Sequence, residues 1–509
     1  MADHRLQLYE FAHMLIQNGH FDVIHFQDHA DELWLERYEN KTSTVIRLIH
    51  RGFDWKNHLK RDIAITLQRA KKLKPMISGK RMEICNVYFS PFAPVDDWES
   101  LKKPIHLKEK QSIKMKVYYI DREEGEDEKN RLLEDLAVEY PISPSPNEEE
   151  KDISGYKHYI HERIKMKKAE ITNIFSYGKP IFTYLFIAVN LLLYFFMELA
   201  NGNELETLIA FGAKYNVAIV EANEWWRLFT SMFIHIGFLH LFMNMVAVYY
   251  LGMTVERIFG SIRFLFIYFL AGIAGSIASF AFSPNISAGA SGAIFGLFGA
   301  LLVFGIHYKH IFRKTMGFNL LFILGINIAV GFVLPQIDMA AHLGGLAGGF
   351  LAAQMIHLPR KRHFRKQLLS ALLLALLLGI GVPFGIQQNE SSQTYQLMKI
   401  EELIKKEEYE SVIHVSTDAL QLKGDYDGVL LFHRSYAYIE LGKYENAIKD
   451  LEHSLSYDIY PESYYNLALL YMEIGEKKLA ELYAKKAFDM NPDNGSFIEL
   501  YENIMDEKQ

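Results

Sequence analysis

Two residues stand out for their chemical potential, a serine and a histidine that each open a glycine-rich apolar segment. Ser291 lies in Ser287-Ala-Gly-Ala-Ser-Gly-Ala293, and His342 lies in Asp338-Met-Ala-Ala-His-Leu-Gly-Gly345. If the two apolar segments cross a membrane, Ser291 and His342 lie at a similar depth in it. Polar groups are costly inside a membrane, so their presence there calls for a reason. A serine hydroxyl within hydrogen-bond reach of an imidazole is the minimum for an activated nucleophile. We therefore predict that Ser291 is a nucleophile and His342 its general base.

An upstream segment supplies further polar groups. His240 and Asn244 stand at i and i+4, so a helix would present both donors on one face. Acyl transfer needs donors where the tetrahedral oxyanion develops, and the backbone N–H of Ser291 could add a third. We predict that His240 and Asn244 stabilise that charge. For His235 we expect a structural or water-binding role, with an oxyanion role as the alternative.

The competing explanation for these residues is helix packing. Serine in a glycine-rich span commonly joins helices, and a lone histidine can do the same. The joint pattern with His240 and Asn244 favours chemistry over packing. Asp338, four residues before His342, could complete a triad, but a helix cap fits it better. The expected mechanism is therefore a dyad.

The elements that carry these residues are apolar runs long enough to cross a bilayer, which takes roughly 20 residues. Two of them, around Ser291 and His342, are rich in small residues and should pack inside a bundle. The runs number seven: 180–200, 229–252, 262–282, 290–308, 317–334, 338–357 and 368–386.

Lysine and arginine set the expected orientation of these spans. They cluster before the first span and in alternate loops, most densely between the sixth and seventh spans, whereas the loop 201–226 holds only Lys214. The N-terminal region should then be cytoplasmic, and the region after about residue 388 extracytoplasmic. Ser291 and His342 should lie near the extracytoplasmic face. The first residues lack an apolar stretch, so no cleavable signal peptide is expected.

Composition narrows the class further. The chain has 509 residues, a net charge of −7 and one cysteine. Without a concentrated basic surface, nucleic acid is not an expected partner. A single cysteine, Cys85, excludes an intramolecular disulfide framework and a cysteine-cluster zinc site, and core packing is its expected role.

Residues 1–155 should form a soluble α+β domain, with an acidic tether from about 121 and a basic juxtamembrane linker at 156–178. Strand-like runs occur in five places: Asp22–Phe26, Glu32–Tyr38, Thr44–His50, Glu83–Phe89 and Lys114–Ile120. Histidines crowd the first 29 residues, among them His20, His25 and His29. A metal site there is the alternative to ordinary polar surface, with His25 and His29 sharing a face if that stretch is helical.

The region 388–509 repeats itself with a spacing of 33 residues, which aligns Gly442–Ala447 with Gly475–Ala480. Small residues recur where paired helices cross, and large residues fill the space opposite. The pattern resembles about three tetratricopeptide repeats, with 496–506 as a cap. It implies a protein-binding groove, although a stack that serves only dimerisation is the alternative.

Taken together, Gly289-Ala-Ser-Gly292, Ala341-His-Leu-Gly-Gly345 with Gly349, and the upstream His235, His240 and Asn244 resemble the rhomboid family over about 178–360. The resemblance implies a Ser291–His342 dyad, with His240 and Asn244 lining the oxyanion hole. It also implies that Phe295, where the family often has tyrosine, packs on the catalytic histidine. Gly289 and Gly345 would support the site, while Trp226-Arg227, Glu256 and Gly260 match structural loop patterns.

The expected architecture is a polytopic α-helical membrane protein. A six-span rhomboid core (179–360) and a seventh span (361–387) lie between the N-terminal domain and the repeats (388–509), an arrangement that resembles Bacillus-type rhomboids. The expected activity is cleavage of transmembrane segments without metal or organic cofactor, in a bacterial plasma membrane. Expected partners are transmembrane substrates, lipid and proteins bound by either soluble domain. The alternative is a membrane-embedded adaptor that delivers clients to quality-control machinery; a transporter is weaker, since charges in the spans are scarce.

Overall fold

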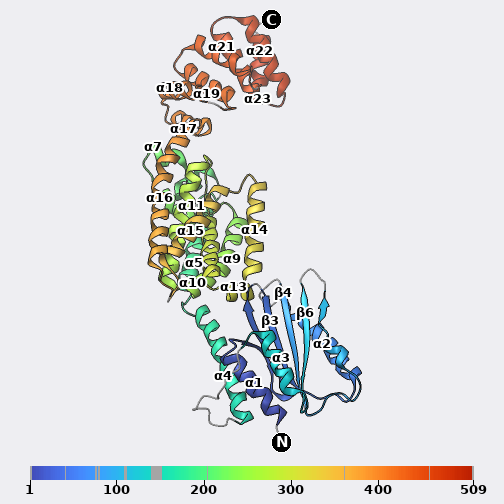
Figure 1. Ribbon diagram of the computed structural model, residues 1–509. Coiled ribbons are helices and arrows are strands. Elements are labelled where there is room, and N and C mark those ends of the chain that lie inside the picture. Colours follow the sequence, from blue (N-terminus) through green and yellow to red (C-terminus); the bar gives the residue numbers. More distant parts are fainter. Residues whose placement is uncertain are drawn as a thin grey trace. The chain divides into compact units, whose positions relative to one another are not determined.

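The computed structural model describes residues 3–506 except 41, 75–76, 78–80, 108–111, 139–151, 203, 360, 423 and 458. It divides into two compact units (Figure 1). The first comprises Met1–Ser176 with Gly305–Leu320, and the second comprises Tyr177–Phe304 with Leu321–Gln509. Each unit has hydrophobic cores of its own.

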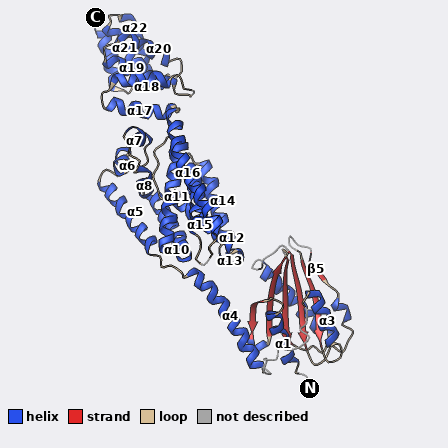
Figure 2. Cartoon of the chain, turned by 60° about the vertical axis from the view of Figure 1, so that its left-hand side comes forward, coloured by secondary structure: helices blue, strands red, loops and turns tan. Residues whose placement is uncertain are grey.

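A six-stranded mixed sheet, in the order β1-β2-β3-β4-β6-β5, forms the centre of the first unit (Figure 2). The β3–β4 and β4–β6 pairs are parallel, and the other pairs are antiparallel. All five predicted strands are present and the predicted α+β class is confirmed. The strands are β1 (Asp22–Gln27), β2 (Glu32–Glu39), β3 (Thr42–His50), β4 (Arg81–Phe89), β5 (Ile105–Leu107) and β6 (Ile113–Ile120).

Helices cover both faces of this sheet, because its central strands are apolar on both sides. One core contains residues of α1 (His4–Gln17), α3 (Gly125–Leu136) and α4 (Ile153–Phe175). The other contains residues of α2 (Lys56–Leu73). Successive strand residues alternate between the two cores as the pleat requires. Cys85 is free and buried in the first core, and burial raises the pKa of its thiol to about 12, so it packs rather than reacts.

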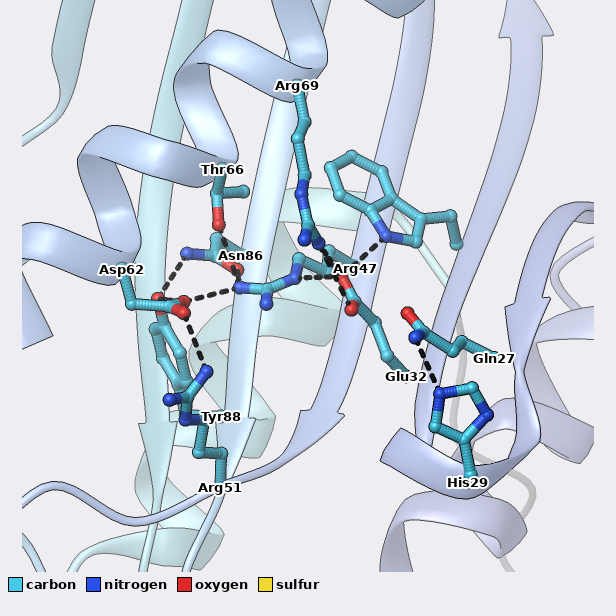
Figure 3. Close-up of polar contacts among 11 residues, drawn as sticks. Gln27, His29, Glu32, Arg47, Arg51, Asp62, Thr66, Arg69, Asn86 and Tyr88 are labelled. Atoms are coloured by element: carbon cyan, nitrogen blue, oxygen red, sulfur yellow. Dashed lines mark hydrogen bonds and ion pairs between the residues drawn. The ribbon is translucent and has the colours of Figure 1, made fainter.

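A buried ionic network lies where α2 meets the sheet (Figure 3). Arg47 on β3 donates from Nε to Glu32 Oε1 and from Nη1 to Asp62 Oδ2, both at 2.7 Å. Nη1 also donates to Thr66 and Asn86. Burial opposes the charge on Arg47, but Asp62 and Glu32 outweigh it, and the pKa of Arg47 is raised.

Two expectations for the first unit need correction. Helix α3 occupies Gly125–Leu136, inside the segment expected to be a loose acidic tether; residues 139–151 of that segment lie outside the described residues. His25 lies on strand β1 and His29 in the 3₁₀ turn Asp28–Ala30, so the helix that would place them on one face is absent from 22–30. Among the described residues, no three His, Cys, Asp or Glu side chains form a metal-binding group.

Most of the apolar segments lie in the second unit, apart from the stretch Gly305–Leu320, which belongs to the first. Five described helical stretches are long and apolar enough to cross a membrane, and the broken pair α13 (Lys309–Thr315) and α14 (Gly317–Val333) makes a sixth. With the shorter apolar α12 (Ser291–His307), these match the seven predicted segments. The five stretches are α5 (Ile181–Leu199), the run Phe238–Phe259, α11 (Ser261–Phe282), α15 (Met339–Ile356) and α16 (Phe364–Glu390).

The second predicted span began too early. Residues 227–233 form the short turns α8 (Arg227–Thr230) and Ser231–Phe233, and Ile234 is extended. Gly237, with φ of +81°, then starts a new helix, α9 (Phe238–Ala247), which continues through a π turn (Val248–Gly252) into α10 (Met253–Phe259). Hydropathy alone cannot reveal this break, because the residues on both sides of it are apolar.

Glycines bring three helices of this unit into close contact. A side chain at Gly345 of α15 would collide with the backbone of Gly292 on α12, and one at Gly349 would collide with Gly296. Gly275 of α11 faces the same crossing, where a side chain would meet Ala341 O. The two segments rich in small residues, around Ser291 and His342, therefore pack inside the bundle as expected.

The C-terminal part is a stack of helical hairpins, as the 33-residue repeat predicts. Ala447, Ala480 and Ala487 are fully buried or nearly so, where paired helices cross. Two apolar cores run through the stack. Its helices are α17 (Gln393–Lys405), α18 (Tyr409–Ala419), α19 (Asp427–Glu440), α20 (Tyr444–Ser454), α21 (Pro461–Glu473), α22 (Lys477–Met490) and α23 (Gly495–Asp506).

Candidate active site

Ser291 is the first residue of α12, and the loop before it is fixed by backbone contacts. Gly289 has φ of +134°, a conformation that side chains rarely tolerate, and its N–H donates to Ser231 O at 2.9 Å. The N–H of Ala290 donates to Nε2 of His235 at 3.4 Å. His235 thus contacts the loop that ends in the serine.

His342 lies in the first turn of α15, and its ring stacks on Phe295. The two ring centroids are 4.1 Å apart with an interplanar angle of 14°. Phe295 is four residues after Ser291, so both project from the same face of α12. Gly292, which follows Ser291, and Ala341, which precedes His342, are also close: a side chain at Gly292 would lie 3.4 Å from Ala341 O. The structure therefore brings Ser291, Phe295 and His342 together at the glycine crossing.

The position of Nδ1 of His342 relative to Asp338 decides between a dyad and a triad. Nδ1 is buried without a hydrogen-bond partner among the described residues. It faces α14, 3.9 Å from where a side chain at Gly331 would begin. Asp338 does not approach it as a third member would: its carboxylate caps α15 by accepting from Ala341 N at 2.9 Å, and it also accepts from the Ser279 hydroxyl. The predicted capping role of Asp338 is confirmed.

His240 and Asn244 lie on α9 and face the loop before the serine. A side chain at Gly289 would meet His240 Nε2 at 2.8 Å and Asn244 Nδ2 at 3.6 Å. The His240 and His235 rings are 5.2 Å apart in an edge-on arrangement. Asn244 Nδ2 is buried and has no acceptor among the described residues. A buried donor without an acceptor is costly, so this amide is suited to a group that arrives with the substrate.

Two family-pattern residues outside this cluster have structural contacts. Glu256 caps α5 by accepting from the N–H groups of Phe182 and Thr183 at 3.0 and 2.8 Å. Arg227 donates to Ile209 O at 2.6 Å and pairs with Glu224, which ties the first loop together.

Sequence reasoning missed Lys214. It lies in the first loop and is only 1% exposed. It is linked both to the loop before Ser291 and to the helix that carries His342. The available signal was that it is the only basic residue of the loop 201–226, where it was counted only as a weak exception to the charge pattern.

Comparison with known proteins gives a consistent result. The sequence signature described as Rhomboid domain matches residues 222–359, and that described as Tetratricopeptide repeat matches 429–458 and 461–494. The chain is 37% identical to rhomboid protease GluP of Bacillus subtilis over 473 residues, covering 91% of this chain and 90% of that protein. It is also 34% identical over 152 residues to the putative rhomboid protease YdcA of that bacterium, covering 30% of this chain and 76% of YdcA.

Proposed function

Since the chain belongs to the rhomboid family and is an intramembrane serine protease, we propose that it cleaves transmembrane segments with Ser291 as nucleophile and His342 as the only general base. The observation that carries this assignment is the stacking of His342 on Phe295, one turn after Ser291 at the glycine crossing. This contact holds the imidazole on the face of α12 from which the serine projects.

The chemistry follows from these positions. The serine oxygen attacks the scissile carbonyl carbon while His342 takes the hydroxyl proton. His342 then donates that proton to the departing amine as the C–N bond breaks. Water repeats the sequence on the acyl-enzyme and regenerates the serine. No carboxylate is needed to hold Nδ1, because the Phe295 ring fixes the orientation of the imidazole.

The oxyanion of the tetrahedral intermediate would be stabilised by Asn244, His240 and the backbone N–H of Ser291. Support comes from the unpartnered amide of Asn244 beside the serine loop. Ser291 begins a helix, so its N–H has no acceptor within that helix. Preorganised donors of this kind act most strongly where water is excluded.

We further propose that cleavage occurs near the extracytoplasmic surface of a bacterial plasma membrane. The starts of α12 and α15 lie at the same end of the bundle as the first loop, which contains only one basic residue. The first helix of the repeats contacts that loop too, with Tyr395 donating to Glu221 at 2.8 Å. The repeats would then be extracytoplasmic, and the N-terminal domain cytoplasmic.

The test is cleavage of a single-span reporter in proteoliposomes. Ser291→Ala and His342→Ala should each abolish cleavage while the variants remain folded. Ser370→Ala, at a buried serine of α16, is the matched control and should cleave like wild type. Retained cleavage in either variant would refute the dyad. In cells, client loss that persists in Ser291→Ala would favour the adaptor alternative.

A further inference from the structure

Lys214 is a buried cation at the meeting point of three elements around the active site. Its Nζ donates to Ser283 O at 2.8 Å and to Ser279 O at 3.4 Å, the carbonyls at the end of α11. A helix C-terminus presents unsatisfied carbonyls and a partial negative charge, which suits an ammonium group. Burial nevertheless penalises the charge.

The same residue holds the serine loop through its backbone. Lys214 N donates to Ser287 O at 2.8 Å, and Ser287 N donates to Lys214 O at 3.1 Å. Ser287 is four residues before Ser291. This two-bond bridge fixes the beginning of the loop that Gly289 and His235 fix at its end.

A second path leads from Lys214 to the histidine. Ser279, whose carbonyl accepts from Lys214, donates its hydroxyl to Asp338. Asp338 caps α15 at Ala341, the residue before His342. Burial lowers the pKa of Lys214 to about 8, while the negative charge of Asp338 opposes that decrease. The side chain of Lys214 therefore binds the end of α11 and, through Ser279, is linked to the cap of the histidine helix, while the backbone of the same residue holds the serine loop.

We propose that Lys214 is a positioning residue of the protease, which sets the rate of the chemical step by holding the Ser291 loop against the start of the His342 helix. This inference rests on the proposed dyad. Lys214 makes no direct contact with Ser291 or His342 in the structure; it acts through Ser287, Ser279 and Asp338. A misplacement of about 1 Å between reacting groups can lower a rate by about a hundredfold.

The test measures kcat and KM for the single-span reporter in proteoliposomes. Lys214→Met keeps the length of the side chain and removes the charge. The expected result is a fall in kcat of about tenfold or more with KM within about twofold, since the substrate is not touched. The matched control is Lys405→Met, which removes an exposed lysine that also reaches the first loop, through Glu206 at 3.5 Å. It should behave like wild type.

A double variant separates positioning from folding. Lys214→Met leaves the Asp338 carboxylate without its nearby cation, so Lys214→Met with Asp338→Asn removes both charges. If Lys214 acts through Asp338, the double variant should be folded and no slower than the slower single variant. The proposal would be overturned if the losses of kcat in the two single variants added up in the double variant. It would also be overturned by wild-type kcat in a folded Lys214→Met, or by failure of both variants to fold. Absence of Ser291-dependent cleavage in the wild type would instead refute the proposed function.

Discussion

Two buried polar clusters of this chain, the Arg47 network and the Ser291 cluster, differ in how completely their groups are paired. In the Arg47 network, Nε and Nη1 of Arg47 and the carboxylates of Glu32 and Asp62 have hydrogen-bond partners. In the Ser291 cluster, His342 Nδ1 and Asn244 Nδ2 are buried without partners among the described residues. Burial alone therefore does not distinguish these two clusters; the state of pairing does.

The difference has a physical reason. In a paired network the donors and acceptors already have partners in the free protein, so none remains to bind a ligand. A donor left unpaired costs stability in the free protein, and that cost is recovered when an acceptor forms on the substrate. Changes in the Arg47 network should therefore lower stability with little effect on catalysis. Changes in the Ser291 cluster should lower the rate of catalysis with little effect on stability.

The largest expected effect is on stability. Arg47→Met should destabilise the N-terminal domain by about 3–5 kcal/mol, because Glu32 and Asp62 would lose their buried cation and keep only the exposed Arg69 and Arg51 as partners. Hydrogen exchange of β3 and α2 amides in the whole protein would measure it, with Arg51→Met, at a 58% exposed side chain, as control. Unchanged exchange in Arg47→Met would contradict the structural role of the network.

Asn244→Ala tests the Ser291 cluster, whose groups should affect catalysis more than stability. Removal of one oxyanion donor should lower kcat by about 10²–10³, or about 2.7–4 kcal/mol of transition-state stabilisation. Thermal stability should stay equal or rise, since an unpaired buried amide is lost. If Asn244→Ala were less stable and its kcat unchanged, Asn244 would have a structural role instead.

Phe295 should contribute less, since it orients the base and does not react. Phe295→Leu should lower kcat by about tenfold, because an aromatic stacking contact contributes roughly 0.5–1.5 kcal/mol. Phe295→Tyr keeps the ring and should retain most of the activity. Equal rates for the leucine and tyrosine variants would show that stacking does not hold His342.

The pH dependence should separate rate from stability at Lys214. As pH rises through about 8, the ammonium loses its charge and kcat should fall, a decline that Lys214→Met should lack. Asp338 is the charged neighbour; Ser279, Ser283 and Ser287 do not titrate in this range. The folded pKa lies below the unfolded value of about 10.4, so the free energy of unfolding should rise from pH 8 to about 10.4. Parallel changes in rate and stability would contradict this account.

The smallest effect is expected where the end of α16 meets the first loop. Asn389 of α16 accepts from Asn216 Nδ2 at 2.6 Å, two residues after Lys214. Asn389→Ala should lower kcat by only about two- to threefold, because Lys214 keeps its own contacts with α11. Cleavage rates of the purified variant would measure it. A loss as large as that of Lys214→Met would mean that α16 itself holds the active site.

Much of this organisation is predictable from the sequence, because it is encoded locally. Strand alternation, the 33-residue repeat and the apolar segments each follow from period or length. The glycine crossing of Ser291 and His342 is predictable because two glycine pairs share a helical spacing. The stacking of Phe295 on His342 came instead from family resemblance.

What escaped prediction depends on contacts between distant segments. The break at Gly237 is hidden because apolar residues lie on both sides of it. Lys214 meets Ser279, Ser287 and, through them, Asp338 only once the loop folds over the bundle. Helix α3 was missed because its acidic composition suggested disorder.

The most direct test of the central claim is covalent labelling of the wild-type protein in detergent with a fluorophosphonate, followed by peptide mass analysis. An activated serine attacks phosphorus and expels fluoride, which leaves a stable adduct. The account predicts one adduct, on Ser291, that is absent in Ser291→Ala and His342→Ala and present in Arg47→Met. An adduct elsewhere, or undiminished labelling of Ser291 in His342→Ala, would contradict it.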